Sequence, residues 1–517
     1  MVVRASSSNG AGLPHLKCSN ATLVLCFGFV IFNTLWINFQ VQLSPNAQER
    51  ATLNGPIKYS DNRRSTKERV SDGFFNGYPV YYHEEKNTES ASWYSSSHCV
   101  GENYQPESSW FQRSCHYSFL CFDMERQDFV VFESPNERAI LPYLDKLPWM
   151  DVSQGYIHLR GHENNVSLGG INLKWTKRGD GIPRLNWSPR ILQEAPTAFY
   201  VLPANVTLIP FHSLSAVNPG HLVWDDFLPA YTMMRMFGLG HHEPLMLRYV
   251  LPDGRGLWAS CDFTDEKTES CRIMHNKFWP LMNTNNQSKL TTNLKVEWQA
   301  PMNKSKYICA RHGLAGFGSL TDHGSMKTHG WDPHDFKTTH NHGRGRMLWD
   351  FRMFAVNNVG FVDQPLKPPY KIVFSTGSSQ MKARNVDFSL HIEVLKSAFD
   401  PSEVVVEEHA FKEYSIAEQV KIASEAAIFV TVCGGGAVTG TFLQRGSSIF
   451  IYYSINSGLH NGRKTDSPAI LDWDIFNNLG YARVHWLPRQ SLSSEEDRNA
   501  FVQLVQNELN RIKLGVQ

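Results

Sequence analysis

The sequence has little net charge and lacks the short motifs that define several common functional classes. Its 517 residues carry a formal net charge of +1 and 19% of them are charged, which argues against a nucleic-acid partner and against an acidic tail. No GxxxxGK[ST] segment is present, which excludes a P-loop, and no CxxC pair is present, which argues against structural zinc. The letters DxD occur as Asp472-Trp-Asp474, late in the chain and before a predicted helix, and we assign no metal to them.

The N-terminal region contains an apolar run, Ala21 to Phe39, that is long enough to cross a bilayer, which needs roughly 17–25 such residues. Arg4 and Lys17 precede the run, which predicts a cytosolic N-terminus. We therefore predict a cytosolic tail over residues 1–20, a single transmembrane signal anchor over 21–39, and a flexible, polar stem over 40–90. A cleaved signal peptide is the alternative, although no A-x-A-like site follows the run.

Five glycosylation sequons after the predicted anchor agree with a lumenal location for the rest of the chain: Asn165, Asn186, Asn205, Asn286 and Asn303. The anchor is short and slightly polar, which suits the thinner membranes of the early secretory pathway. We predict a single-pass type II protein of the Golgi membrane, with the endoplasmic reticulum membrane as the second choice.

Seven of the 9 cysteines follow the anchor and fall into groups. Disulfides are expected within the group Cys99, Cys115 and Cys121, and between Cys261 and Cys271. Cys309 and Cys433 are isolated in the sequence. Because seven is an odd number, at least one of these cysteines is predicted to be a free thiol or to form an intermolecular disulfide.

A glycine turn lies in the stretch from Ile428 to Tyr453, between two apolar runs that are typical of buried parallel strands. Gly434, Gly435 and Gly436 allow a tight turn and a close approach of a ligand to the backbone. A helix that starts after the turn would direct N–H groups and a positive dipole end at that space, which suits a phosphate. The alternative is a plain turn between two core strands. GxGxxG is matched loosely, with Thr439 in place of the third glycine.

Strands and helices alternate regularly from Pro369 onwards, which predicts a doubly wound parallel sheet. The preceding region alternates more loosely and is interpreted as a second α/β unit. The predicted fold class is therefore α/β and GT-B-like: two Rossmann-type domains with a cleft between them, over residues 91–365 and 366–517.

A histidine and two carboxylates, His221, Asp225 and Asp226, lie at a predicted helix start. His221 and Asp225 are four residues apart and share a helix face. A sugar transfer needs a base for the acceptor hydroxyl and a positive environment for the departing nucleotide diphosphate. The His–Asp pair can supply the base, and the glycine turn with Arg445 can supply the positive environment. Helix capping and surface charge are the alternative interpretation of the pair.

The order and spacing of these segments resemble glycosyltransferase family 61, a family of lumenal inverting enzymes that includes plant β-1,2-xylosyltransferases and the EGF-domain O-GlcNAc transferase. In plant members a motif NxxHxxxDxxxP opens a helix, and Asn218, His221, Asp225 and Pro229 match it. The segment CHYSFLC, Cys115 to Cys121, is similar to an N-terminal cysteine pair of the family. The resemblance extends from about Cys115 to Pro488.

The resemblance also implies a nucleotide-sugar site in the C-terminal domain. The family has an Arg…Asn segment after a strand, which matches Arg384 and Asn385, and a segment HGAGLTNxLFLPxG, which resembles Cys433 to Gly446. This chain departs from the pattern because Cys433 stands where the family has His and Gly440 stands near its Thr-Asn. The chain would therefore be a divergent member that needs no cofactor and no divalent metal.

We thus predict an inverting glycosyltransferase that transfers a sugar from a UDP-sugar to a hydroxyl of a glycan or glycoprotein. Asp225 is the predicted base, His221 orients it or shares the proton, and Asp226 lies beside them. The predicted donor-binding residues are Arg384, Asn385, Cys433, Gly434, Gly435, Gly436, Thr439 and Arg445.

Two other classes of function stay open. The first is a catalytically inactive glycan-binding or scaffold homologue, which Cys433 in the histidine position favours. The second is a metal-dependent hydrolase that uses a histidine-rich middle region, His323, His329, His334, His340 and His342.

Overall fold

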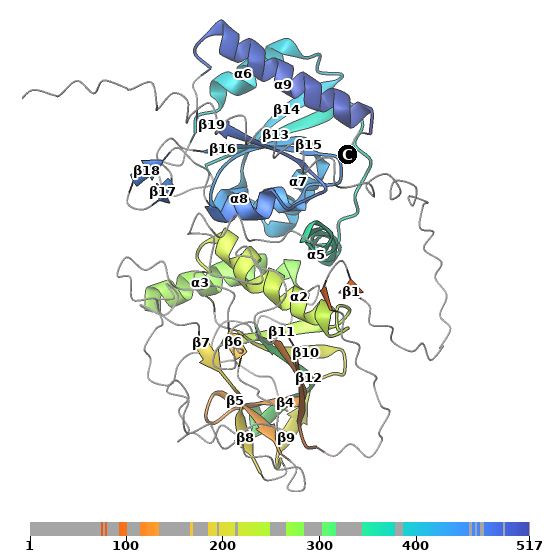
Figure 1. Ribbon diagram of the computed structural model, residues 1–517, viewed down its shortest axis with the longest axis vertical. Coiled ribbons are helices and arrows are strands. Elements are labelled where there is room, and N and C mark those ends of the chain that lie inside the picture. Colours follow the sequence, from red (N-terminus) through yellow and green to blue (C-terminus); the bar gives the residue numbers. More distant parts are fainter. Residues whose placement is uncertain are drawn as a thin grey trace, which may run out of the picture. The chain divides into compact units, whose positions relative to one another are not determined.

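The structure is a computed structural model, and all of its described residues belong to one compact unit, Val70–Gln517 (Figure 1). It describes residues 74–75, 78–79, 93–100, 114–133, 166–168, 185–193, 196–211, 213, 216–248, 265–283, 302–316, 344–377, 386–453, 458–460, 463–465, 470–489 and 492–515. The predicted tail and anchor lie outside these ranges. So does the predicted stem, apart from the paired strands β1 (Phe74–Phe75) and β2 (Tyr78–Pro79). Within these ranges no helix has the length and apolar character needed to cross a membrane.

The C-terminal half contains a five-stranded sheet in which every pair of neighbours is parallel, in the order β14-β13-β15-β16-β19. This confirms the parallel sheet that the alternation of strands and helices predicts. Its strands are β13 (Tyr370–Thr376), β14 (Val404–Ala410), β15 (Ala426–Val432), β16 (Ser448–Tyr453) and β19 (Arg483–Pro488). Every residue of the central strand β15 is buried, which explains its continuous apolar sequence.

Helices cover both faces of this sheet (Figure 1). The helices are α6 (Ser389–Ala398), α7 (Ile416–Glu425), α8 (Ile470–Phe476) and α9 (Glu495–Lys513). Alternate side chains of β15 enter different cores: Ile428 and Val430 pack in the core that contains α6 and α9, whereas Phe429 packs in the core that contains α7 and α8. The segment that directly follows β15 packs in the core that contains α7 and α8, because Cys433 and Ala437 belong to it.

The N-terminal half is built on a mixed sheet rather than the second Rossmann-type sheet that we predicted. Its path is β11-β10-β12-β4-β5-β8, with β3 beside β4 and β9 beside β12. β10 is parallel to both β11 and β12, but β4 is antiparallel to β3, β5 and β12. The strands are β3 (Ser96–Val100), β4 (Ser114–Asp123), β5 (Asp128–Phe132), β8 (Arg190–Leu192), β9 (Phe199–Val201), β10 (Val206–Phe211), β11 (Glu243–Arg248) and β12 (Tyr307–Gly316). The connection between β4 and β5 is only four residues long, Met124 to Gln127, and a short connection of this kind joins antiparallel neighbours without a helix between them.

The remaining elements connect or flank the two sheets. The helices are η5 (His221–Phe227), α2 (Leu228–Met236), α3 (Asp265–Phe278), η7 (Trp279–Leu281), η9 (Met302–Lys304), α5 (Arg344–Asn358), η11 (Phe411–Glu413) and η12 (Gly435–Phe442). Two antiparallel hairpins are β6 (Val166–Leu168) with β7 (Leu185–Trp187), and β17 (Gly458–His460) with β18 (Arg463–Thr465). One core cluster includes Leu222 and Phe351 together with Phe429 and Phe442, so it contains side chains from both sides of the predicted boundary at residue 365.

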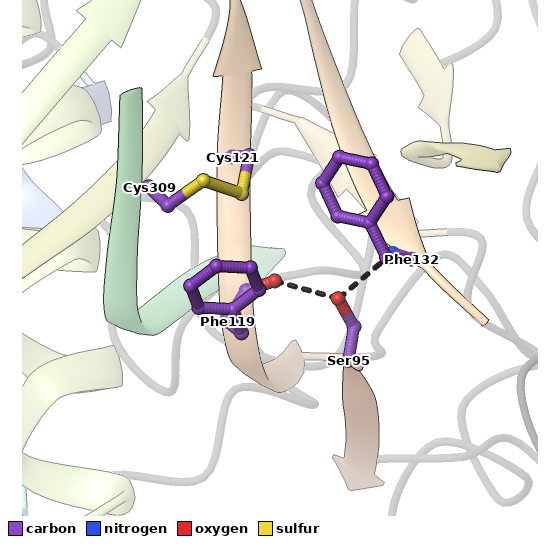
Figure 2. The surroundings of a disulfide bond; sticks show 5 residues. All are labelled: Ser95, Phe119, Cys121, Phe132 and Cys309. Atoms are coloured by element: carbon purple, nitrogen blue, oxygen red, sulfur yellow. Dashed lines mark hydrogen bonds between the residues drawn. A yellow bond between two sulfur atoms is a disulfide. The ribbon is translucent and has the colours of Figure 1, made fainter. Parts of the chain in front are cut away.

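Two disulfides fasten strand β4 to its neighbours. Cys99–Cys115 joins β3 to β4, as the grouping of the cysteines predicts. Cys121 does not pair within its group: it bonds to Cys309, which is isolated in the sequence and lies 188 residues away (Figure 2). The antiparallel register places Cys121 directly opposite Cys309, with their Cα atoms 3.9 Å apart. Cys271 also takes part in a disulfide, and Cys433 is a buried thiol.

The hydroxyl of Ser95 links two strands beside this disulfide (Figure 2). It donates to the carbonyl oxygen of Phe119 at 2.7 Å and accepts from the backbone N–H of Phe132 at 2.9 Å. Phe119 has a positive φ of 61°, which a bulky residue rarely adopts. The hydroxyl therefore satisfies the backbone at the point where β4 departs from regular strand geometry.

Acid sensitivity of the C-terminal half is expected to depend on Glu508 of α9. Burial would raise the pKa of this carboxyl, but hydrogen bonds with His485, Ser448 and Arg483 outweigh burial and lower its pKa to about 2. A carboxyl with a pKa of about 4.3 in the unfolded chain then contributes up to about 3 kcal/mol of stability, present above pH 4.3 and lost as the pH falls towards 2. Urea denaturation of wild type and Glu508→Gln between pH 6 and pH 3 should show a shallower loss of stability in the variant. Equal slopes would contradict this role.

Candidate active site

The glycine turn begins at the carboxyl end of β15 and leads into the 3₁₀-helix η12. Gly434 has φ of 121°, a conformation that L side chains rarely adopt, so glycine is required there. Its N–H donates a short hydrogen bond to the carboxylate of Asp472, which is buried in α8. Cys433 donates its N–H to the carbonyl of Tyr452 on β16 at 2.9 Å. The turn is therefore fixed from both neighbouring elements before η12 starts.

The far end of η12 is fastened by side chains from η5, from α5 and from the loop before β19. The Trp224 indole donates to the hydroxyl of Thr441 at 3.1 Å, and the Tyr481 hydroxyl donates to the Thr441 carbonyl at 2.6 Å. Burial raises the pKa of Tyr481, so its hydroxyl keeps the proton that it donates. The guanidinium of Arg352 donates to the carbonyl of Phe442 from Nε and from Nη2, at 3.2 and 3.1 Å. With both ends held, η12 is a rigid platform.

A π-helix, η5, carries the predicted catalytic residues. Pro229 lies at the start of α2 and has no N–H that could donate to the carbonyl of Asp225, four residues earlier. The helix is widened to a π-helix just before this proline, because that hydrogen bond cannot form. His221 Nδ1 lies 2.7 Å from Asp225 Oδ2, which confirms that the two side chains share a face. The Asp225 side chain is 1% exposed and the His221 side chain 11% exposed. Asp226 is buried and accepts from Ser213 Oγ at 2.6 Å.

The loop before η5 lies directly against the glycine turn. Asn218 Oδ1 accepts from the N–H of Gly220 at 3.0 Å, which fixes the Asn218 side chain. A Cβ added at Gly435 would overlap that same oxygen and would lie 3.1 Å from Asn218 Cγ and 3.5 Å from Pro219 Cδ. The two segments that the sequence places more than 200 residues apart therefore meet at Gly435, and only a glycine fits the contact.

A cavity of about 380 Å³ opens at this contact. Residues from the two sheets and their connections line it, namely Val217, Asn218, Pro219, Met274, Lys277, Phe278, Gly377, Phe411, Lys412, Gln419, Val432, Cys433, Gly434, Gly435, Gly436, Val438 and Thr439. The lining combines glycine backbone and polar side chains with the apolar side chains of Met274, Phe278, Phe411 and Val438. A pocket that offers both kinds of surface can hold a ligand with a charged group and a flat, apolar group.

Two lysines that were not predicted supply positive charge to the cavity. Lys277, in the last turn of α3, donates from Nζ to the carbonyl of Lys412 at 2.9 Å. Burial lowers the pKa of Lys277. Lys412 is exposed and lies in η11, immediately after β14. The position of Lys412 at the carboxyl end of a parallel strand was a usable signal in the sequence, whereas Lys277 is brought to the cavity by tertiary folding alone.

Thr439 lines the cavity, but its hydroxyl donates its hydrogen bond to another side chain of the protein. Its hydroxyl donates to Gln419 Oε1 at 3.2 Å, and Gln419 Nε2 donates to the carbonyls of Phe411 and Tyr414 at 2.8 and 3.1 Å. Gln419 is buried in α7. This chain of bonds connects η12 to the turn that carries Phe411 and Lys412.

The other predicted donor-binding residues lie elsewhere or outside the described ranges. Arg445 is exposed, and its guanidinium lies over the ring of Trp349, 5.0 Å from the centroid, rather than among the residues that line the cavity. Arg384 and Asn385 fall outside the described residues, as does the cluster of five middle-region histidines. Asp472, which we expected before a helix, lies inside α8 and holds the glycine turn. Among the residues that the structure describes, no group of three or more His, Cys, Asp or Glu side chains could hold a metal ion.

Comparison with known proteins places the glycine turn inside a recognised family segment. The family model for glycosyltransferase 61 matches residues 286–450, which include the turn and η12. Residues 286–450 are therefore similar to the glycosyltransferase 61 family. This confirms the resemblance that the motifs indicate and supports the glycosyltransferase class. The match begins after η5, so the His221–Asp225 pair lies outside it.

Curated relatives extend the similarity over more of the chain. Protein O-linked-mannose beta-1,4-N-acetylglucosaminyltransferase 2 of Pan troglodytes is 23% identical over 367 residues, and the protein of that name from Homo sapiens is 22% identical over 365 residues. Each alignment covers 68% of this chain and 52% of the relative, so the chain spans about half the length of these proteins. Among solved structures, the flavodiiron protein from Giardia intestinalis aligns with 49% of this chain and 54% of its own at 12% identity. Its TM-score of 0.20 says nothing about this fold.

Proposed function

We propose that this protein transfers a sugar from a UDP-sugar to a hydroxyl of a glycan or glycoprotein, with inversion at the anomeric carbon. The observation that carries the proposal is the contact between Asn218 and Gly435. It places the segment with the candidate base against the turn that borders the cavity. The match to the family supports the reaction class, and the relatives' name, an N-acetylglucosaminyltransferase, makes UDP-N-acetylglucosamine the first donor to test.

In this proposal the diphosphate lies between the glycine turn and the two lysines. The first N–H groups of a helix have no partner within the helix, and in η12 these follow Gly434. Lys277 and Lys412 take the role that we predicted for Arg445, because they line the cavity. The apolar side chains of Phe278 and Phe411 would receive the flat nucleobase. Cys433 lies beside the diphosphate, and Arg384 and Asn385 remain proposed donor contacts.

We assign the base to His221 and the orienting role to Asp225, the reverse of the roles expected from the sequence. A carboxylate only accepts hydrogen bonds, so His221 Nδ1 carries the proton of the 2.7 Å bond and Nε2 is the basic nitrogen. Asp225 is the more deeply buried of the two and cannot meet an acceptor as readily. Asp226 is bonded to Ser213 and would position η5.

The proposed step balances without a further reactant. His221 Nε2 takes the proton from the acceptor hydroxyl, and the acceptor oxygen forms a bond to the anomeric carbon from the face opposite the leaving group. The bond between that carbon and the diphosphate oxygen breaks, and UDP leaves with the electron pair. The lysine ammonium groups stabilise the negative charge that develops on the diphosphate.

In this proposal the protein resides in the secretory pathway, as a single-pass protein of the Golgi membrane whose catalytic part faces the lumen. The apolar run at 21–39 and the sequons after it support this location. A fusion to a reporter that is glycosylated only in the lumen would test the orientation.

Calorimetric titration with UDP tests the donor site, and Gly435→Ala provides the informative variant. A methyl group at Gly435 would displace Asn218, and overpacking of 1–3 kcal/mol corresponds to roughly 5- to 150-fold weaker UDP binding. Gly440→Ala is the matched control in the same helix, because its Cβ would meet Ile449 and Phe476 in the core rather than the cavity. Binding by wild type and Gly440→Ala, with loss in Gly435→Ala, is the expected result. Wild-type protein that binds no UDP, and releases none from any common UDP-sugar, would overturn the proposal.

A further inference from the structure

The turn that carries Phe411 and Lys412 is held from behind by side chains that do not reach the cavity. It follows β14, the edge strand of the parallel sheet, and consists of η11 with Tyr414 directly after it. Within the turn itself, the Tyr414 N–H donates to the Phe411 carbonyl at 3.2 Å. One such bond fixes a three-residue helix weakly, so the position of Lys412 depends on the side chains around it.

A tyrosine, a histidine and a glutamate form a chain behind the turn. His409 Nδ1 lies 3.1 Å from the Tyr414 hydroxyl, and His409 Nε2 lies 3.0 Å from Glu407 Oε2. The carboxylate only accepts, so Nε2 carries the proton and Nδ1 accepts from the tyrosine. Lys371 Nζ lies 3.8 Å from Glu407 and 2.7 Å from Glu425 and so holds the end of the chain. The imidazole therefore ties the residue after the turn to the strand before it.

The front of the same turn is tied to the cavity wall. Gln419 Nε2 donates to the carbonyls at both ends of the turn, Phe411 and Tyr414, and Lys277 donates to the Lys412 carbonyl. Gln419 also accepts from Thr439 of η12. A shift of Tyr414 would consequently move both lysines and the wall of η12 together.

We infer that Glu407, His409 and Tyr414 are positioning residues for donor binding, which fix the turn that presents Phe411 and Lys412 to the nucleotide. This inference rests on the proposed function, because it takes the cavity as the donor site. None of the three side chains is among the residues that line the cavity. Their removal should therefore weaken donor binding and leave the proton transfer unchanged. The signature is a raised KM for the donor with kcat near the wild-type value.

The test compares Tyr414→Phe with Tyr370→Phe in the full-length protein. Tyr414→Phe removes one hydroxyl, and a hydrogen bond of ordinary strength corresponds to about 3- to 10-fold weaker UDP binding and an equal rise in donor KM. Tyr370 lies at the other end of the sheet, at the start of β13, so its variant should bind UDP like wild type. Unchanged UDP affinity in Tyr414→Phe, with wild type binding normally, would overturn this inference and leave the proposed function standing.

A second pair of variants separates positioning from a loss of folding. His409→Ala should weaken UDP binding by a similar factor, and His409→Gln should restore it, because a glutamine amide can donate to Glu407 and accept from Tyr414. If both variants lost the same UDP affinity, the positioning role would be contradicted, because a side chain able to bridge Glu407 and Tyr414 would then bind UDP no better than one that cannot. Wild-type protein without UDP affinity would overturn the proposed function, and this inference with it.

Discussion

Replacing His221 by alanine is expected to lower kcat by about 10²- to 10⁴-fold, the usual contribution of a general base. The affinity for UDP should stay near the wild-type value, because His221 does not line the cavity. The physical reason is the His221–Asp225 bond, which fixes the proton on Nδ1 and leaves Nε2 as the base. The measurement is UDP release at saturating donor and acceptor, with calorimetry on the same preparations.

The controls separate the base from its neighbours. His241→Ala removes an exposed histidine after α2 and should leave kcat unchanged. Asp225→Asn should lower kcat as well, because an amide can donate to Nδ1 and can favour the other imidazole tautomer. A His221→Ala enzyme with wild-type kcat, together with an inactive Asp225→Asn enzyme, would return the base to Asp225.

Local patterns in the sequence predicted the elements that carry the site. Ser415 and Glu418 have the spacing of a capping box, and the structure has that box at the start of α7. Ser494 likewise accepts from the Asp497 N–H at 3.0 Å where α9 begins. The i,i+4 spacing of His221 and Asp225 produced the expected pair. These features need only neighbours along the chain, so spacing and residue type are sufficient to predict them.

Contacts between distant segments could not be predicted in this way. Cys309 pairs with Cys121 because β12 and β4 adopt one antiparallel register, which no local pattern reveals. Lys277 reaches the cavity from α3, and Asp472 reaches Gly434 from α8. The sequence presented Asp472 as part of a DxD, and the fold uses its carboxylate to hold a backbone N–H.

The sequence pointed to Arg445 rather than to the two lysines for the same reason, because contacts between distant segments cannot be read from local patterns. Arg445 is close to the glycine turn in sequence, but η12 lies between them and the guanidinium stacks on Trp349 of α5. Proximity along the chain therefore overestimated proximity to the ligand. The positive charge that the proposed chemistry needs is present, and it comes from α3 and η11.

Replacing Arg352 by methionine is expected to lower the free energy of unfolding by about 3–5 kcal/mol, the usual cost of breaking a buried ion pair from one side. Arg352 is 0% exposed, pairs with Asp363, and donates to the Phe442 carbonyl and the Ser424 hydroxyl. Its loss leaves Asp363 without its cation. Urea denaturation measures the effect, and Arg346→Met on the same helix is the matched control, because the Arg346 side chain is 49% exposed and its ion pair with Asp350 lies near the surface.

The same substitution tests whether the anchoring of η12 matters for the proposed donor site. Arg352 lies on α5, before the predicted boundary at residue 365, yet it bonds to the last residue of η12. If η12 is a platform for the diphosphate, then folded Arg352→Met protein should bind UDP more weakly, while Arg346→Met should bind it normally. A variant that loses stability but keeps its UDP affinity would show that the other contacts of the turn and of η12 are sufficient to fix them. In that case Arg352 of α5 would contribute to the stability of the fold and not to UDP binding.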